Sequence, residues 1–361
     1  MTAHVLGIGT VSALGCGIDS FKSGLEGTAA PLIKEEEIKT PSGRIRSKAF
    51  RTEVVGLDRF MPKPKLRRID NFLQTALMAS YLSIEDSGLE IEDKTRTGVI
   101  FGSGYGALQT SLSFFDDLID YGDKCASPTQ FANSVHNSLV SNVSINLKLQ
   151  GPCLTVSALE MTTASVFSTA LAWLDSGAVD YVLAGVGDEY SKVNSYAAHL
   201  MGAEGVEAMK PFAFDECSYI PGEGFVTFML GKKASPRQYG RIDKVLSGKD
   251  TSLADRELNA LFLSANGDKE TGRYYKALEL PHTGLFSYSA LYGGMPVGQG
   301  FDLAAAALSL KEGVYYRSSG HGITASNQAG PIKIDMTKGR THIGCLQYDK
   351  DGNCSLISIS G

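Results

Sequence analysis

The sequence has few of the features that mark secreted, membrane-spanning or nucleic-acid-binding proteins. Its 361 residues include six cysteines, with no CxxC pair and no zinc-ligand spacing, which favours inert thiols in a reducing cytosol over disulfides or a metal site. No apolar run approaches the roughly 20 residues that span a bilayer, and the start of the chain lacks the basic and apolar regions of a signal peptide. A net charge of −5 offers no basic surface to a nucleic acid. We therefore expect a soluble, cytoplasmic protein with no metal, no cofactor, no nucleic-acid partner and no membrane contact.

The residues that are present predict a large α/β protein. With 43% hydrophobic residues the chain can bury a substantial core, as one large domain or two ordinary ones. Short apolar runs alternate with helical patterns, which predicts a mostly parallel sheet with helices on both faces. The strand-like runs lie at residues 5–9, 99–102, 154–156, 181–184, 224–230 and 261–265, and the helical patterns at residues 18–25, 67–86, 131–148, 158–174 and 302–311.

Two segments depart from this alternation. Residues 34–65 are charged and contain three prolines, so we expect an excursion packed over the core. Near the C-terminus, the strand-like residues 341–348 and 353–358 flank Asp349-Lys-Asp-Gly352. A glycine at that place, where a turn needs a positive φ, predicts a β-hairpin.

Four segments resemble, in order along the chain, the signatures of β-ketoacyl-ACP synthases. Residues 151–160 (GPCLTVSALE) are similar to their nucleophile segment, in which a Gly-Pro is followed by a strand, a sharp elbow and the catalytic cysteine. The other three are residues 176–185 (SGAVDYVLAG), residues 211–224 (PFAFDECSYIPGEG), which resemble a PFD…GEGA signature, and residues 293–313, which resemble a GHLLGAAG helix ending in LxLKEG. The resemblance extends over the whole chain, and the four motifs together make it specific.

The resemblance implies a thiolase-like fold, with two similar halves in an α-β-α-β-α layered core. It would form a single thiolase-like unit over residues 1–361, with approximate ketosynthase-like halves at 1–215 and 216–361. The family is dimeric through strands near the nucleophile segment. This makes Phe131, Asn133 and His136 our candidates for the interface.

The departures from the family pattern concern its catalytic residues. Family condensing enzymes use a cysteine, which carries the acyl chain, and two histidines, which stabilise the enolate oxygen. By the same resemblance, this chain has Glu160 in place of the cysteine, Asn266 and Met295 in place of the histidines, and Ala290 in place of a lysine that precedes the second histidine. All four catalytic positions are therefore degenerate.

These replacements remove the chemistry of condensation. A thiolate is a strong nucleophile, whereas a carboxylate at Glu160 would have to form a reactive mixed anhydride. Asn266 can still donate one hydrogen bond to an oxyanion, but Met295 can donate none. Decarboxylating relatives replace the cysteine with glutamine and keep both histidines, so that route is closed as well.

Glu160 also has a structural interpretation. Ser157 and Glu160 fit an S-x-x-E capping box at the start of a helix, where a carboxylate faces the positive end of the helix dipole. Alternatively, Glu160 fills the former pocket or reaches a polar group of a partner. The pocket itself differs from the family, because residues 347–352 (QYDKDG) replace an apolar FGFGG gate and residues 230–266 form a shorter stretch.

Three further features have weaker functional interpretations. Residues 102–106 (GSGYG) lack the Lys-Ser/Thr of a phosphate loop. The basic run at residues 63–68 (KPKLRR) either contacts an acidic carrier protein or is a solvated helix start. His282, His321 and His342 lie outside the family's histidine positions, and His136 is more typical of a structural residue than a catalytic one.

The sequence thus predicts a member of the ketosynthase acyltransferase superfamily that is inactive on its own. We expect a chain-length-factor-like subunit that pairs with an active ketosynthase in fatty-acid or polyketide biosynthesis and works with an acyl carrier protein. Two alternatives stay open: an acyltransferase or condensing enzyme with repurposed chemistry around Glu160, and a stand-alone acyl- or carrier-binding homodimer.

Overall fold

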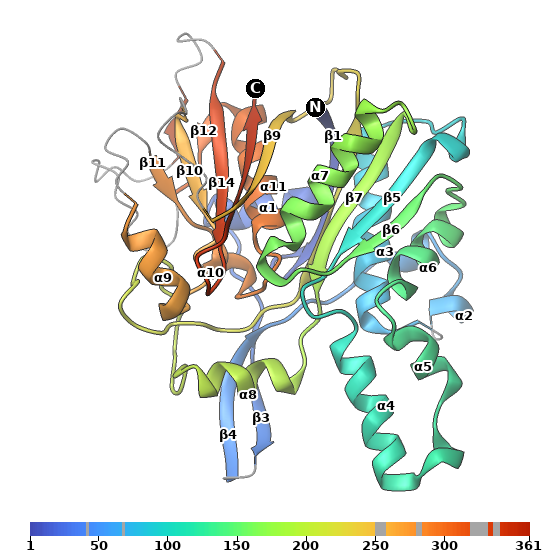
Figure 1. The fold of residues 1–361 in the computed structure, drawn as a ribbon, viewed down its shortest axis with the longest axis vertical. Coiled ribbons are helices and arrows are strands. Elements are labelled where there is room, and N and C mark those ends of the chain that lie inside the picture. The colour runs from blue at the N-terminus through green and yellow to red at the C-terminus, as the bar shows by residue number, and fades with distance from the viewer. Residues whose placement is uncertain (41–42, 67–68, 250–257, 279–283, 318–330, 335–339) are drawn as a thin grey trace.

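The computed structural model contains two sets of strands side by side, with helices between and outside them (Figure 1). It describes residues 1–40, 43–66, 69–249, 258–278, 284–317, 331–334 and 340–361. Among these residues no helix is long and apolar enough to cross a bilayer. The described part of the chain also holds no group of three or more residues able to ligate a metal.

Each set contains five strands in the same spatial order. The first set, in the order β6-β5-β7-β8-β1, consists of β1 (Ala3–Ser12), β5 (Thr97–Gly102), β6 (Cys153–Val156), β7 (Tyr181–Asp188) and β8 (Gly224–Gly231). The second, in the order β11-β10-β14-β15-β9, consists of β9 (Gly240–Gly248), β10 (Ala260–Leu263), β11 (Gly284–Phe286), β14 (His342–Tyr348) and β15 (Cys354–Ser360). Numbered along the chain, both orders read third, second, fourth, fifth, first, which confirms two similar halves.

The two sets join through their first strands. Ala3 of β1 lies opposite Ile242 of β9 in an antiparallel pair, so the sheet is continuous from β11 to β6. Within each set the first three strands of the order are parallel, but the last two pairings are antiparallel. The expectation of a mostly parallel sheet is therefore wrong, because the fifth strand of each half runs against its neighbours. The strand order assigns β8 to the first half, so we propose a division after β8 in place of residue 215.

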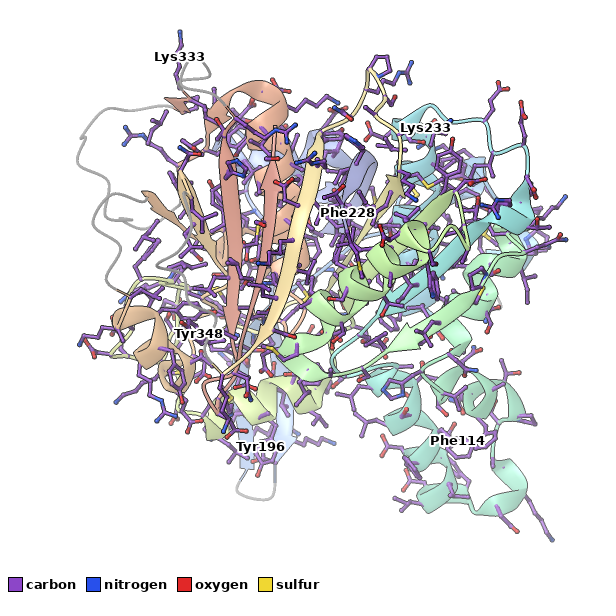
Figure 2. The ribbon with its side chains drawn as sticks, turned by 45° about the horizontal axis from the view of Figure 1, so that its top comes forward. Phe114, Tyr196, Phe228, Lys233, Lys333 and Tyr348 are labelled. Atoms are coloured by element: carbon purple, nitrogen blue, oxygen red, sulfur yellow. The ribbon has the colours of Figure 1, made fainter. Side chains whose placement is uncertain are left out.

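The helices form three layers around these strands. Between the strand sets lie α1 (Ile18–Leu25), α7 (Thr162–Asp175) and α11 (Gln299–Glu312), which share one core cluster with strands of both halves. Helix α11 is buried on all sides, and its alanines allow strands of both halves to approach closely. Outside the first set lie α3 (Asn71–Ser87) and α6 (Ser138–Leu147), and outside the second lies α9 (Lys269–Lys276). Figure 2 shows Phe228 in the central layer, where the centroid of its ring lies 5.3 Å from that of Phe167.

Several expected elements differ from the observed ones. The expected helix at residues 67–86 begins at Asn71, because the side chain of Asp70 accepts a hydrogen bond from the backbone N of Leu73 and caps the helix. The expected helix at residues 131–148 is two helices, α5 (Pro128–Ser134) and α6, because Val135 takes an extended conformation. Several of the described elements had no sequence prediction, among them α4 (Leu108–Tyr121), α8 (Lys192–Leu200), α9 and β9.

The charged segment at residues 34–65 is more regular than expected. It holds the antiparallel hairpin of β3 (Ile33–Thr40) and β4 (Gly43–Phe50), which projects from the body of the molecule instead of covering its core (Figure 1). Only the end of the hairpin, at Ala49 and Phe50, is fully buried. The predicted C-terminal hairpin is confirmed, with Gly352 at φ 80°. The remaining short elements are β2 (Gly15–Cys16), η1 (Leu57–Arg59), α2 (Lys63–Leu66), η2 (Lys94–Arg96), η3 (Asp123–Cys125), η4 (Leu159–Met161), α10 (Ser289–Tyr292), β12 (Val314–Tyr315) and β13 (Ile332–Lys333).

Candidate functional site

The segment between β6 and α7 forms a sharp elbow that carries Glu160. Leu159, just before it, has φ 45°, a left-handed conformation that is strained for a leucine. Glu160 lies in the single turn of η4, and α7 begins only at Thr162. The elbow therefore presents Glu160 before the helix starts.

The predicted capping box is wrong. The hydroxyl of Ser157 donates to the backbone O of Gly104 at 3.3 Å, and the backbone N of Ala158 donates to the hydroxyl of Thr162 at 2.8 Å. Helix α7 thus begins two residues beyond Glu160. The hydroxyl of Thr162, and not the side chain of Ser157 or Glu160, accepts a backbone hydrogen bond at the start of this helix. Glu160 has no capping role at α7.

The surroundings of Glu160 favour its protonated form. The side chain is half-buried, and its removal from water raises the pKa of the carboxyl above its ordinary value. The nearby carboxylates of Asp349 and Asp268 raise this pKa further, while Lys350 lowers it. In either protonation state, a carboxyl is a weaker nucleophile than the thiolate of a cysteine.

The glycine-rich loop at residues 102–106 binds a carboxylate of the protein itself. Asp188, at the end of β7, is fully buried and accepts hydrogen bonds from the hydroxyl of Ser103 at 2.6 Å and from the backbone N of Tyr105 at 3.0 Å. Burial raises the pKa of Asp188 to about 6 in spite of these donors. A Cβ on Gly104 would lie 2.5 Å from Cβ of Pro296, so this loop also needs a glycine for close packing. The loop is therefore a structural support of the site.

Of the four positions predicted to be degenerate, Glu160 and Met295 lie in segments that meet at Gly104, whereas Ala290 packs elsewhere. Gly104 packs against Pro296, the residue after Met295, and Gly104 also accepts the hydrogen bond from Ser157 in the elbow. Met295 is buried, with 2% of its surface exposed. Ala290, in α10, packs instead against a separate cluster formed by Ala13, Phe50, Met209 and Ile220.

Asn266 follows β10 in a turn that its own side chain stabilises. Its Oδ1 accepts a hydrogen bond from the backbone N of Asp268 at 3.1 Å, and Asp268 in turn caps α9 through the backbone N of Glu270. Asp268 acts on the pKa of Glu160, which places this turn on the same side of the molecule as the elbow. Asn266 thus has a structural use where the family has a histidine.

Two tyrosines of the site were not singled out from the sequence. The hydroxyl of Tyr219 donates to the backbone O of Gly294 at 2.9 Å and is also hydrogen-bonded to Tyr105. Burial raises the pKa of both phenols well above the ordinary value, and the charge of Glu160 adds to the effect. Both therefore stay protonated and can act only as neutral hydrogen-bonding groups. Tyr219 lies in the PFAFDECSYIPGEG signature, which was the available signal.

The turn that replaces the family's gate is held on two sides. The carboxylate of Asp349 accepts hydrogen bonds from the backbone N of Asp351 at 2.9 Å and from the backbone N of Asn353 at 2.8 Å. From α9, Arg273 and Tyr274 donate to the backbone O of Lys350 at 3.0 and 3.3 Å. These hydrogen bonds tie the turn to itself and to α9.

The three interface candidates lie on α5 and in the turn that follows it. Phe131 is 60% exposed, and the centroid of its ring lies 5.7 Å from that of Phe114. Figure 2 shows Phe114 in the part of the molecule that projects from the body. Asn133 is half-buried, and His136 is exposed, with its imidazole against Gly106. The neighbouring β6 is the last strand of the sheet.

The other histidine and basic candidates lie away from the elbow or outside the described residues. His342 begins β14 and lies 3.6 Å from the carboxylate of Asp243, at the end of the strand opposite to the turn beside Glu160. His282 and His321 lie outside the described residues. Of the basic run, Lys63 and Lys65 are exposed on α2, whereas Arg67 and Arg68 lie outside the described residues.

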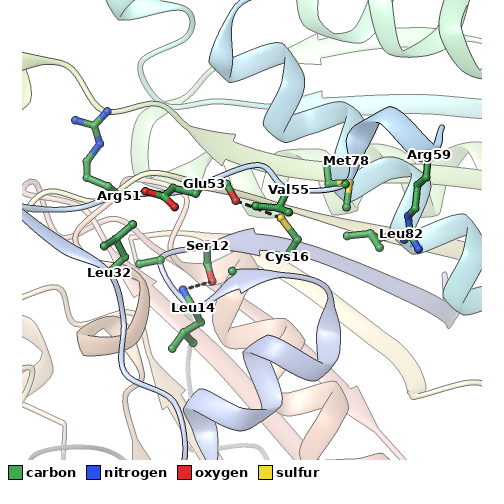
Figure 3. Close-up of a pocket in the computed structure, with 13 residues that line it drawn as sticks. Ser12, Leu14, Cys16, Leu32, Arg51, Glu53, Val55, Arg59, Met78 and Leu82 are labelled. Carbon is green, nitrogen blue, oxygen red and sulfur yellow. Dashed lines mark hydrogen bonds between the residues drawn. The ribbon is translucent and has the colours of Figure 1, made fainter. Parts of the chain in front are cut away.

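An open cavity of about 640 Å³ lies at the end of β1, away from Glu160 (Figure 3). Both arginines that line it already form ion pairs, Arg51 with Glu36 and Glu223 and Arg59 with Glu85. Its cysteine, Cys16, donates to the backbone O of Glu53 at 3.5 Å, and burial raises the pKa of the thiol. A thiol with a raised pKa is a weak nucleophile, so we assign this cavity no part in catalysis.

Comparison with known proteins identifies the family. Residues 10–235 match the family model of the beta-ketoacyl synthase N-terminal domain. The chain therefore belongs to the beta-ketoacyl synthase family. It is 28% identical over 233 residues to 3-oxoacyl-[acyl-carrier-protein] synthase 2 of Vibrio cholerae, covering 61% of this chain and 55% of that protein. It is 27% identical over 254 residues to the protein of the same name from Rhizobium meliloti, covering 65% and 60%. The chain thus matches about half the length of these curated relatives.

Solved structures establish the thiolase-like fold over nearly the whole chain. The ishigamide ketosynthase/chain length factor superposes with a TM-score of 0.78 at 14% identity, over 99% of this chain and 98% of that one. A beta-ketoacyl synthase from Burkholderia phymatum STM815 gives 0.75 at 15% identity, over 99% of both chains. A structure of AntDE:AntF, a type II PKS acyl-carrier protein in complex with its ketosynthase, gives 0.74 at 14% identity, over 99% and 98%. The predicted fold class is confirmed.

Proposed function

We propose that this chain is a non-catalytic ketosynthase-family subunit, comparable to a chain length factor, that pairs with an active ketosynthase in the cytoplasm. Its role would be to complete the dimer and shape the acyl tunnel of its partner in fatty-acid or polyketide synthesis, with an acyl carrier protein as the substrate carrier. The observation that carries this proposal is Glu160, a half-buried carboxyl with a raised pKa at the elbow where the family has its thiol nucleophile.

The oxyanion side of the site supports the same conclusion. Each oxyanion donor is worth roughly 3–4 kcal/mol of transition-state stabilisation. Met295 offers no donor and is buried, and Asn266, whose Oδ1 is engaged with the turn before α9, offers only its amide N–H donors. With the nucleophile and one of the two donors absent, condensation has no covalent intermediate and a less stabilised enolate.

A concentration of exposed apolar side chains supports the pairing. Of the thirteen large hydrophobic residues exposed in the described part of the chain, eight lie between residues 115 and 159. A patch of this kind on a soluble protein typically marks an interaction surface. The eight are Phe115, Ile119, Tyr121, Phe131, Val135, Ile145, Leu154 and Leu159.

One observation favours the alternative of an enzyme with repurposed chemistry. A carboxyl whose pKa is raised by burial is the type of group that serves as a general acid near neutral pH. In that function Glu160 would donate a proton to a bound acyl thioester. The alternative predicts turnover by the chain alone, and that turnover would be lost in Glu160→Gln.

Two measurements test the proposal. The purified chain, given malonyl- and acyl-loaded acyl carrier protein, should release no CO2 and form no carbon–carbon bond above the background of Glu160→Gln. Native mass spectrometry after co-expression with a Cys-His-His ketosynthase encoded beside its gene should show a one-to-one complex. Turnover by the chain alone would establish the enzyme alternative, and a stable homodimer that ignores the ketosynthase would favour the stand-alone binding protein.

A further inference from the structure

Helix α4 carries an apolar stripe that no part of the described chain buries. Leu108, Leu112, Phe115 and Ile119 follow one another at spacings of four, three and four residues, the pattern of a helix–helix seam. None of the 14 residues of α4 is buried, and Phe115 and Ile119 are 55% and 78% exposed. A strongly amphipathic helix of this length normally packs its apolar face against another element.

The protein's own helices leave this stripe open. Helix α5 covers a different side of α4, where the ring centroids of Phe114 and Phe131 lie 5.7 Å apart. The α4–α5 pair extends away from the body of the molecule (Figure 1). The stripe therefore faces outward on the same part of the chain as the exposed edge strand β6, in which Leu154 is 41% exposed.

The charges on α4 all have one sign. Asp116 and Asp120 each follow a stripe residue and Asp117 adds to them, whereas α4 contains no lysine, arginine or histidine. Beyond the end of the helix, Asp123 and Lys124 of η3 carry opposite charges. Within the described residues, neither Asp116 nor Asp120 forms an ion pair, and both are exposed. An acidic border around an apolar centre complements a helix with an apolar centre and a basic border.

We infer that the α4 stripe receives a helix of the ketosynthase partner whose flanks carry lysine or arginine, and that Asp116 and Asp120 oppose pairing of two copies of this chain. The inference rests on the proposed function, because it concerns the partner of the same subunit. A two-fold dimer of this chain formed through this surface would use the same surface of both copies, so the acidic borders of both stripes would enter one interface. Like charges placed face to face select against the wrong partner more than they strengthen the right one.

The first experiment uses the chain alone. Sedimentation velocity should show a predominantly monomeric protein at about 50 mM NaCl and increased self-association at about 500 mM, where screening shortens the reach of charge repulsion. The variant Asp116→Asn/Asp120→Asn should self-associate at least about fivefold more tightly at the lower salt concentration. The matched control, Glu90→Gln/Glu92→Gln, removes two exposed acids elsewhere on the surface and should behave as the wild type. A tight wild-type dimer that does not respond to salt, or an equal response of the control, would overturn the opposition to self-pairing.

The second experiment uses the co-expressed ketosynthase. Asp116→Lys/Asp120→Lys and Phe115→Ala/Ile119→Ala should each weaken the complex at least about tenfold, while circular dichroism and the Tm show that both variants fold. A complex of unchanged affinity would overturn the assignment of a basic partner helix to this stripe. If the wild type forms no complex at all, the proposed function fails by that result, and the opposition to self-pairing is still decided by the sedimentation data.

Discussion

Glu223 and Arg51 form an ion pair in which Nε of Arg51 lies 3.0 Å from Oε1 of Glu223. The same Oε1 accepts a hydrogen bond from the backbone N of Thr52 at 2.8 Å, and Oε2 accepts one from the backbone N of Tyr190 at 3.1 Å. Glu223 belongs to the PGEG part of the family signature. Its carboxylate therefore joins the end of the projecting hairpin to the loop between β7 and α8.

Removing this carboxylate should destabilise the protein strongly. The side chain of Glu223 is only 4% exposed, so Glu223→Ala leaves Nε of Arg51 and two backbone amides without their acceptor, although Glu36 still pairs with Arg51. We expect a loss of about 3 kcal/mol in the free energy of unfolding and a smaller loss for Glu223→Gln, which keeps an acceptor oxygen. Urea denaturation measures both. Glu53→Ala, which breaks the exposed pair with Lys34, is the control and should cost less than about 1 kcal/mol. Equal losses at Glu223 and Glu53 would contradict this account.

At Leu159 in the elbow, glycine should give a more stable protein than alanine. Leu159 has φ 45°, a region that costs a residue with a Cβ about 1–2 kcal/mol, and glycine avoids that cost. We expect Leu159→Gly to be more stable than Leu159→Ala by about 1 kcal/mol in chemical denaturation. At the control position Ile145, an exposed residue inside α6, the order should reverse by about the same amount. The same order of glycine and alanine at both positions would show that the elbow is not strained.

The stability of the protein should fall between acidic and alkaline pH because of Glu189. This carboxyl accepts a hydrogen bond from the backbone N of Gln109 at 2.8 Å at the start of α4, and burial, with the charges of Asp70 and Glu223, raises its pKa to about 8. Since the folded pKa exceeds the ordinary value of 4.5, the folded state holds the proton more tightly. The associated stability is fully present below about pH 4.5 and is lost as the pH rises to about 8.

Glu189→Gln should remove the part of this pH dependence that Glu189 contributes, because glutamine stays neutral and still offers an acceptor to Gln109. Thermal unfolding at about pH 5 and about pH 8.5 should show a decline for the wild type, worth a few kcal/mol, that is clearly smaller in the variant. The decline that remains comes from buried carboxyls such as Asp188 and Asp302, whose pKa values are raised to about 6 and about 7. The exposed control Glu90→Gln should keep the decline. A wild-type curve parallel to that of Glu189→Gln would be the contrary result.

Restoring the thiol alone should not restore condensation. Glu160→Cys returns the nucleophile but leaves Asn266 and Met295 in place of the two imidazoles, so the amide of Asn266 is the one donor left at these two positions for the enolate of a malonyl unit. We expect carbon–carbon bond formation at the level of the wild type, measured by product mass spectrometry with acyl- and malonyl-loaded carrier protein. Condensation by Glu160→Cys at a rate well above that background would show that the site retains more of its oxyanion machinery than Asn266 and Met295 suggest.

Local patterns located most of the helices and strands correctly. The helix Ile18–Leu25 and the hairpin around Gly352 follow from apolar spacing and turn residues alone, because both depend on neighbours in the sequence. The break at Val135 and the regular hairpin of β3 and β4 were missed. In these places the backbone is set by packing and cross-strand pairing, which residue spacing does not encode.

The sequence by itself determined the family motifs and their order, since these are matters of residue identity at a given spacing. From the same motifs it predicted that Glu160 stands in place of the thiol and that Asn266 and Met295 stand in place of the two imidazoles. Only the tertiary structure decided how those groups are used. Ser157 donates to Gly104 instead of capping a helix, Tyr219 reaches Gly294, and the fifth strand of each half runs antiparallel to its neighbours. The physical reason is that a hydrogen-bond donor takes the acceptor that the folded chain places beside it. These acceptors come from residues 53 and 75 positions away in the sequence.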